Sequence, residues 1–299
     1  RFVAPRPANA LLVYSPESLF AEGGLLAETP YPGIETWTSP LVELGVDHEI
    51  WDVGVIGRTP TAAELMSYRV VLWRPEELQP PPAGFPSALT TYVNAGGNLF
   101  VSSFDLLTRL TEVQASAFIT NVLHVVGRQE DAGAFAVTGI AGDPVGGGKA
   151  FDLNYDDFPS GFLIDILGIV WADGPDHLNA ATNAAPTYLQ EGGRPVGVRF
   201  PKTGQDATTG RVVFQSFGLE SVPVAGDPPN NRRTVLADAL RFLSPELVAG
   251  STIAFDQTSY TIPGNAVVEV TDSKRAGLGR VRVSVVADAA QEEKEQAET

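Results

Sequence analysis

Short apolar runs alternate with amphipathic stretches along the first 245 residues of the chain. Runs of four or five apolar residues predict buried strands, and the amphipathic stretches between them predict helices. The predicted strands are Ala10–Tyr14, His48–Val53, Arg69–Trp73, Leu99–Ser102, Val196–Phe200 and Arg211–Gln215. Strands and helices that alternate at this spacing indicate a mostly parallel sheet with right-handed crossovers. The predicted fold class is therefore α/β, a doubly wound domain over residues 10–246 with helices on both faces.

Five segments have helical spacing and end at turn or capping residues such as Gly45 and Ser244–Pro245. They are Ile34–Leu44, Ala62–Ser67, Phe85–Val93, Gln114–Val125 and Arg232–Leu243. Between the fourth and fifth helices, the glycine- and aspartate-rich segment 134–193 predicts irregular strands and long loops. The predicted core includes one residue from each of four strands and two from the last helix, namely Leu12, Val71, Phe100, Val213, Leu236 and Leu240.

After Gly250 apolar and polar residues alternate, which is typical of antiparallel strands. The predicted strands are Thr252–Phe255, Ser259–Ile262, Ala266–Thr271 and Arg280–Val286. A complete immunoglobulin-like sandwich needs about 100 residues, so residues 250–287 are expected to form only a partial immunoglobulin-like β module. Residues 1–9 form a proline-containing N-terminal extension, and the acidic residues 288–299 form a tail.

Composition and charge narrow the classes of partner. The net charge of −16 argues against nucleic acid, because phosphates require a basic surface. No apolar run reaches the ~18 residues that a membrane-spanning helix needs. The chain has no cysteine, which excludes disulfides, thiolate catalysis and thiolate metal sites. Because the chain starts with Arg1 and shows no signal peptide, we expect a processed segment of a longer protein.

Several short motifs in the first four fifths of the chain resemble class I glutamine-amidotransferase-like domains. They are Leu44–Val46, His48–Asp52, Tyr68–Leu72 and Gly96–Ser103. Three more, Phe118–Leu123, Gly142–Pro144 and Phe217–Glu220, resemble non-catalytic versions of that fold within large secreted bacterial proteins and peptidases. Such versions are often followed by immunoglobulin-like repeats. The resemblance implies a flavodoxin- or amidotransferase-like sheet in an extracellular or cell-surface protein.

The catalytic residues of that family are missing at the matching positions. The place of the cysteine nucleophile falls on Phe104, and the His-Pro-Glu motif falls on Gly218, Leu219 and Glu220. Glutamine hydrolysis by the family's mechanism is not expected, because it needs a thiolate and a base to activate it. The retained Glu220 is expected to lie near Ser102–Asp105.

Ser102 ends the predicted central strand and Ser103 follows it, at the end where open α/β sheets place ligands and reacting groups. Together with Glu220 they are the candidate catalytic residues. A hydroxyl nucleophile would need a histidine base, but His124 falls on a predicted helix and no other histidine is obviously placed. The favoured interpretation is that the two serines cap the next helix.

A run of acidic and amide side chains offers a candidate calcium site at Asp152, Asn154, Asp156 and Asp157. Alternate oxygen ligands are typical of a Ca²⁺ loop. The sixth position is Asp157 rather than glycine, however, and the twelfth is Leu163 rather than glutamate. A solvated acidic loop is the favoured interpretation, and Ca²⁺ is the one cofactor considered. The nearby Gly146–Lys149 lacks the flanking residues of a phosphate loop and indicates a flexible turn.

A catalytic fold without catalytic residues favours a non-enzymatic structural or interaction module. The β module is too small to bury both faces of a sandwich, and unpaired edges invite strand addition. We therefore expect self-association by strand exchange, with Arg1–Asn9 as a candidate donor, or association with adjacent domains of the parent chain. The alternative is a hydrolase, or an accessory domain of a secreted peptidase, with Ser102–Asp105 and Glu220 lining a pocket. A small-molecule or Ca²⁺-binding module is the third possibility.

Overall fold

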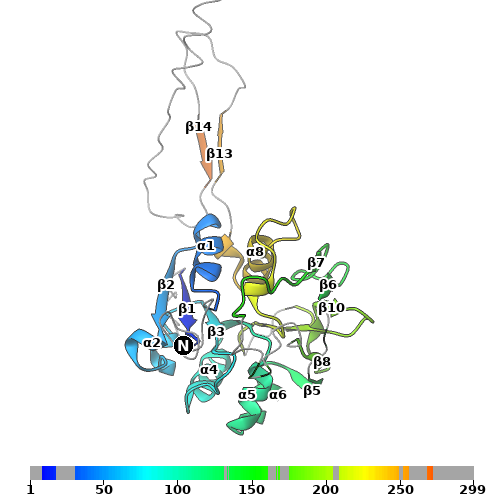
Figure 1. The fold of residues 1–299 in the computed structure, drawn as a ribbon. Coiled ribbons are helices and arrows are strands. Elements are labelled where there is room, and N and C mark those ends of the chain that lie inside the picture. The colour runs from blue at the N-terminus through cyan, green and yellow to red at the C-terminus, as the bar shows by residue number, and fades with distance from the viewer. Residues whose placement is uncertain are drawn as a thin grey trace, which may run out of the picture. The chain divides into compact units, whose positions relative to one another are not determined.

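The computed structural model divides the chain into two units, Arg1–Val248 and Ala249–Thr299 (Figure 1). In the first unit the structure describes residues 9–17, 31–130, 133, 135–160, 166, 168, 175–204 and 209–248. In the second it describes residues 252–255 and 268–271. No helix within these residues is long and apolar enough to cross a bilayer.

The first unit is built on a seven-stranded sheet in the order β2-β1-β3-β4-β12-β11-β9. In chain order these strands are β1 (Ala10–Tyr14), β2 (His48–Asp52), β3 (Val70–Arg74), β4 (Asn98–Ser102), β9 (Ala185–Pro186), β11 (Gly197–Phe200) and β12 (Val212–Gln215). The five strands from β2 to β12 are parallel, whereas β11 pairs antiparallel with both β12 and β9. The predicted mostly parallel sheet is confirmed, and β4 lies at its centre.

Successive residues of the central strands point to opposite faces of the sheet, and each face is covered by helices (Figure 1). One face packs against α1 (Glu35–Glu43), α8 (Arg232–Leu243) and α9 (Pro245–Val248). The other packs against α3 (Ala62–Leu65), α4 (Phe85–Asn94), α5 (Leu106–Glu112) and α6 (Ser116–Asn121). All six residues predicted for the core are fully buried. A short helix, α2 (Val53–Ile56), follows β2 directly.

The helix predicted over Gln114–Val125 is wrong in its extent. The structure has α6 over Ser116–Asn121 only, and the strand β5 (Val125–Gln129) begins where the helix was expected to end. Gln114 and His124 both have φ of 56°, a left-handed conformation that breaks the helix on either side. His124 therefore lies in a turn, where its ring stacks on Phe200 at a centroid distance of 3.9 Å.

The irregular strands expected between α6 and β12 form two small antiparallel sheets. One pairs β5 with β8 (His177–Ala180), and the other has the order β10-β6-β7. The bounds of the latter strands are Ala136–Gly139 for β6, Ala150–Asp152 for β7 and Tyr188–Gln190 for β10. Among the described residues of the segment 134–193, only β9 joins the seven-stranded sheet, as an antiparallel edge strand.

In the second unit β13 (Thr252–Phe255) pairs antiparallel with β14 (Val268–Thr271). These correspond to two of the four predicted strands. The other two, Ser259–Ile262 and Arg280–Val286, lie outside the described residues, as do the acidic tail and the N-terminal extension before Asn9. The immunoglobulin-like nature of this unit stays a prediction.

Candidate functional site

The carboxyl ends of four neighbouring parallel strands meet at one edge of the sheet. β1 continues into Ser15–Glu17, β3 ends at Arg74, and β4 ends at Ser102, while β12 leads into the 3-10 helix η3 (Leu219–Ser221). Open α/β sheets bind ligands and place reacting groups at this edge. Side chains from these segments form a buried polar group that we call the Arg74 cluster, made of Glu17, Arg74, Glu77, Ser103 and Glu220.

Arg74 occupies the middle of the cluster and is 1% exposed. Its Nε lies 3.0 Å from Oε1 of Glu220, and its Nη1 lies 3.2 Å from Oε1 of Glu17. Nη1 also donates to the carbonyl oxygen of Ser15. Burial by itself lowers the pKa of Arg74, but the two facing carboxylates outweigh it and raise the pKa above its usual value. The guanidinium is therefore charged and paired on two sides.

Glu77 connects the arginine to the central strand. Its Oε2 accepts hydrogen bonds from Ser103 Oγ at 2.6 Å and from the backbone N of Asp105 at 3.1 Å. Its own backbone N donates to Oε1 of Glu17 at 2.6 Å. Burial raises the pKa of Glu17 to about 7 and raises the pKa of Glu77 well above the usual range of a carboxyl group. The cluster thus places three carboxyl groups around one guanidinium, and burial favours the protonated forms of Glu17 and Glu77.

Glu220, which lies 146 positions after Arg74 in the sequence, joins this cluster from η3. Its Oε1 accepts from Trp37 Nε1 at 2.9 Å and from Arg74 Nε at 3.0 Å. A link through Arg74, Glu17 and Glu77 leads from Glu220 to Ser103. One oxygen of Glu17, one of Glu220 and Nη2 of Arg74 are buried without a hydrogen-bond partner within the described residues.

The structure gives both candidate serines defined partners. Ser102 Oγ donates to the carbonyl oxygen of Phe217 at 2.7 Å. Ser103 Oγ donates to Glu77 and accepts from the backbone N of Leu106, the first residue of α5, at 3.1 Å, so it satisfies one N–H group at the start of that helix. Both side chains are fully buried, and neither hydroxyl bonds to a histidine in the part of the chain that the structure describes. Phe104 follows them and is buried, and Gly218 precedes η3.

The calcium candidates lie on the surface. Asp152 ends β7, and Asn154, Asp156 and Asp157 follow it with exposed side chains. Asn154 Oδ1 accepts from the backbone N of Asp156 at 2.7 Å. Within the described residues no three histidine or acidic side chains are grouped so as to hold a metal ion, and the calcium site stays a prediction. Lys149 of the glycine-rich turn is buried and bonds to Asp238 and to the carbonyl oxygen of Val145.

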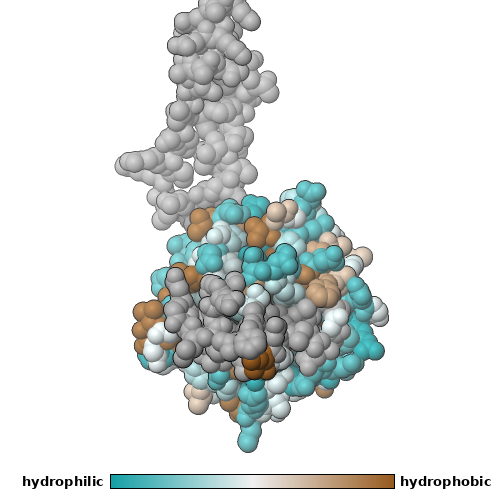
Figure 2. Space-filling model, viewed as in Figure 1, coloured by the Kyte–Doolittle hydropathy of each residue, from teal (hydrophilic) through white to brown (hydrophobic). Residues whose placement is uncertain are grey.

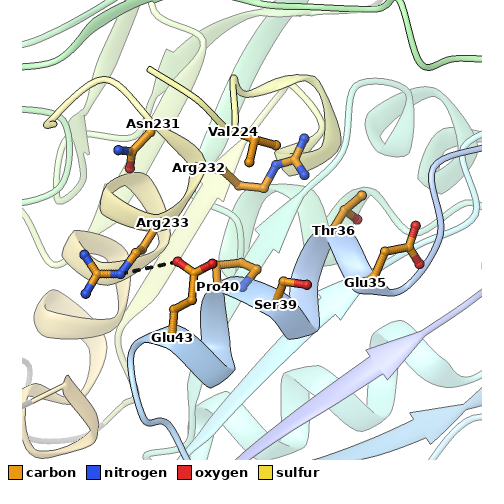
Figure 3. Close-up of a pocket in the computed structure, with 9 residues that line it drawn as sticks. All are labelled: Glu35, Thr36, Ser39, Pro40, Glu43, Val224, Asn231, Arg232 and Arg233. Atoms are coloured by element: carbon orange, nitrogen blue, oxygen red, sulfur yellow. Dashed lines mark ion pairs between the residues drawn. The ribbon is translucent and has the colours of Figure 1, made fainter. Parts of the chain in front are cut away.

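Two hollows lie near the cluster. One, of about 170 Å³, is lined by residues flanking Glu17 and Arg74 in the chain, including Ser15, Pro16, Trp73, Pro75 and Glu76. The other, of about 300 Å³, lies between α1 and the N-terminal end of α8, where Arg233 faces Glu43 at 3.6 Å (Figure 3). Arg232 lines this second hollow and donates to the carbonyl oxygens of Val222 and Glu220.

Three members of the cluster, namely Glu17, Arg74 and Glu77, were not predicted from the sequence. A signal was present, because Arg74 directly ends an apolar strand and two glutamates follow it within three residues. Charged residues at the carboxyl end of a buried strand are the pattern that could have identified this site. Their mutual contacts could not be read from the chain, because Glu17 and Glu220 lie far from Arg74 in sequence.

No protein-family model matches the chain, and no curated protein matches it. Among solved structures, a ThuA-like protein from Bacteroides uniformis ATCC 8492 has 12% identity and a TM-score of 0.46, covering 81% of this chain and 94% of that one. A glutamine amidotransferase from Thermotoga maritima has 10% identity and a TM-score of 0.39, covering 81% and 99%. The exo-β-1,4-mannosidase Op5Man5 from Opitutaceae bacterium strain TAV5 has 13% identity and a TM-score of 0.41.

That match covers 72% of this chain but only 32% of the mannosidase, so the chain spans about a third of that enzyme. The activities named for these proteins belong to those proteins. The likenesses concern the α/β fold alone.

Proposed function

We propose that this chain is a non-enzymatic structural or interaction module of an extracellular or cell-surface bacterial protein. The observation that carries this proposal is the state of the serine hydroxyls at the carboxyl edge of the sheet. A nucleophile needs an accessible oxygen and a base that activates it. Ser102 and Ser103 are fully buried, and each hydroxyl already serves as a structural donor.

The Arg74 cluster supports a structural role for this edge. It joins the ends of β1, β3 and β4 to η3 through charge-assisted hydrogen bonds. Buried polar groups with many mutual contacts rigidify the segments that carry them. The extracellular or cell-surface setting rests on the resemblance to non-catalytic amidotransferase-like domains, and the domains that flank this segment in the parent gene would test it.

A hydrolase or an accessory peptidase domain is the second candidate function. It is favoured by the raised pKa values of Glu17 and Glu77 beside a hollow at the carboxyl edge, because strongly shifted groups in a cleft often mark active sites. Structural ion-pair networks shift pKa values as well. The buried, hydrogen-bonded serine hydroxyls are the reason that we favour the first candidate.

A fluorophosphonate probe separates the two functions. We expect no labelling of the folded chain at pH 7 to 9, because neither buried hydroxyl can reach the phosphorus atom. A known serine hydrolase in the same tube controls for probe reactivity, and glutaminase activity is measured in parallel. Labelling at Ser102 or Ser103 that disappears in Ser102→Ala or Ser103→Ala would overturn the proposal.

A further inference from the structure

The two ends of the seven-stranded sheet differ in how they are protected. At one end β9 has two residues, one of which is Pro186. Short edge strands and proline both prevent further strand pairing. At the other end β2 has five residues paired in continuous register with β1, and its sequence contains neither lysine nor proline. Within the described residues no strand pairs with its outer side.

The register shows which main-chain groups of β2 point outward. Ala10 lies opposite His48, and its backbone N donates to the carbonyl oxygen of Asp47. In a parallel pair, every second residue of one strand bonds to the two residues that flank its partner, and Ala10 is such a residue, whereas Leu11 is not. The main-chain N–H and C=O groups on the β1 side of β2 therefore belong to Asp47, Glu49 and Trp51. Those of His48 and Ile50 point away from the sheet.

The side chains at this edge are suited to a protein partner. Ile50 is 47% exposed, and Val55 of the adjoining helix α2 is 83% exposed. Figure 2 shows apolar side chains at the surface over α2. His48, Ile50 and Asp52 share one face of the strand, because alternate residues point the same way. The edge therefore presents an exposed apolar residue between a basic and an acidic one.

We propose that β2 of one copy of this chain pairs antiparallel with β2 of a second copy, about a two-fold axis at Ile50. This deepens the proposed function, on which it rests, because it names the surface and the partner. Antiparallel pairing at this axis uses the outward main-chain groups and sets Ile50 opposite Ile50 of the second copy. It also sets His48 opposite Asp52 of the second copy, twice by symmetry.

Charge selects this register over its neighbour. Moving the axis one residue toward the N-terminus would place Glu49 opposite Glu49 of the second copy, and like charges directly opposite each other are unfavourable. The pairing centred at Ile50 avoids that contact and overlaps the full length of the strand. Because the interface is isologous, it closes as a dimer and leaves no open end.

Sedimentation equilibrium of the full chain tests the dimer. His48→Lys is expected to keep it, because lysine still faces Asp52 of the second copy. His48→Glu is expected to raise the dimer dissociation constant by about tenfold or more relative to His48→Lys, because repulsion then occurs twice. Both variants lose the same contact of His48 with the carbonyl oxygen of Val46, so a purely structural role of His48 predicts equal effects.

A second pair of variants locates the interface. Ile50→Lys places two cations at the axis and is expected to give monomers. Val126→Lys, at a strand residue of β5 that is 59% exposed, is the matched control and should leave the dimer intact. Circular dichroism confirms that each variant is folded. A monomeric parent chain, or a dimer that survives both Ile50→Lys and His48→Glu, would overturn the proposal.

The register can be checked directly because the chain has no native cysteine. Ile50→Cys is expected to form an intermolecular disulfide under mild oxidation, since paired strand residues bring the two Cα atoms within about 5.5 Å. Val126→Cys should not cross-link. The fluorophosphonate result does not depend on these variants, so a failed dimer and a failed non-enzymatic function would be told apart.

Discussion

Replacing Arg74 with methionine is expected to lower the free energy of unfolding by about 3 to 5 kcal/mol. Removal of one partner leaves buried charges without compensation, and Glu17 and Glu220 both face the guanidinium. The loss should be smaller at pH 5 than at pH 8, because protonated carboxyl groups need no cation. Denaturant unfolding at the two pH values measures both effects.

Arg233→Met is the matched control for this prediction. Its guanidinium is half exposed and lies 3.6 Å from Glu43, which is also exposed. Exposed pairs contribute about 0 to 1 kcal/mol, so the control should change stability little. If both substitutions lower the free energy of unfolding by the same amount, the Arg74 cluster does not stabilise the carboxyl edge of the sheet.

The chain is expected to lose stability as the pH rises from about 4.5 through 7. Burial raises the pKa of Glu17 to about 7 in the folded state, compared with 4.5 for the free group. The folded state therefore binds a proton that the unfolded state has released. Stability from this group is complete below pH 4.5 and disappears as the pH passes 7, and the shift corresponds to about 3 kcal/mol.

Glu17→Gln isolates this effect because glutamine cannot ionise. Between pH 4.5 and 8 the free energy of unfolding of the variant should fall by about 3 kcal/mol less than that of the parent chain. Urea unfolding across that pH range measures the difference. Glu191→Gln, at an exposed position, should reproduce the parent's pH dependence. Glu64, whose pKa is lowered to about 2 by its hydrogen bond with Arg58, titrates below this window. Parallel curves for the parent and Glu17→Gln would show that Glu17 does not retain a proton in the folded state.

Local sequence patterns are sufficient to predict the parallel part of the sheet. β1, β3 and β4 are each specified by five local residues whose apolar character suits burial on both faces, and the first four predicted strands all lie side by side in this sheet. The helix α8 was equally local, since its apolar spacing and its end at Ser244 lie within one short segment. Such elements can be predicted because hydrophobic periodicity and helix capping depend only on residues that are close together in the sequence.

Other features depend on contacts between residues that are distant in the sequence. The helix breaks at His124, which has a left-handed backbone conformation and stacks on Phe200. Because Phe200 lies 76 positions further along the chain, hydrophobic periodicity near His124 does not reveal this contact. The antiparallel turn of β11 against β12 likewise depends on how the intervening chain folds back.

The Arg74 cluster is the strongest case. Glu17, Arg74 and Glu220 meet because three parallel strands end at the same edge, although 146 positions separate Arg74 from Glu220. The sequence marked the two serines as polar residues at a strand end, and the family resemblance marked Glu220. Their roles depend on burial, because a charged group inside the fold is stable only beside a partner of opposite charge or a hydrogen-bond donor. Burial also raises the pKa values of Glu17 and Glu77. No single stretch of the chain contains that environment, because it exists only once the sheet has assembled.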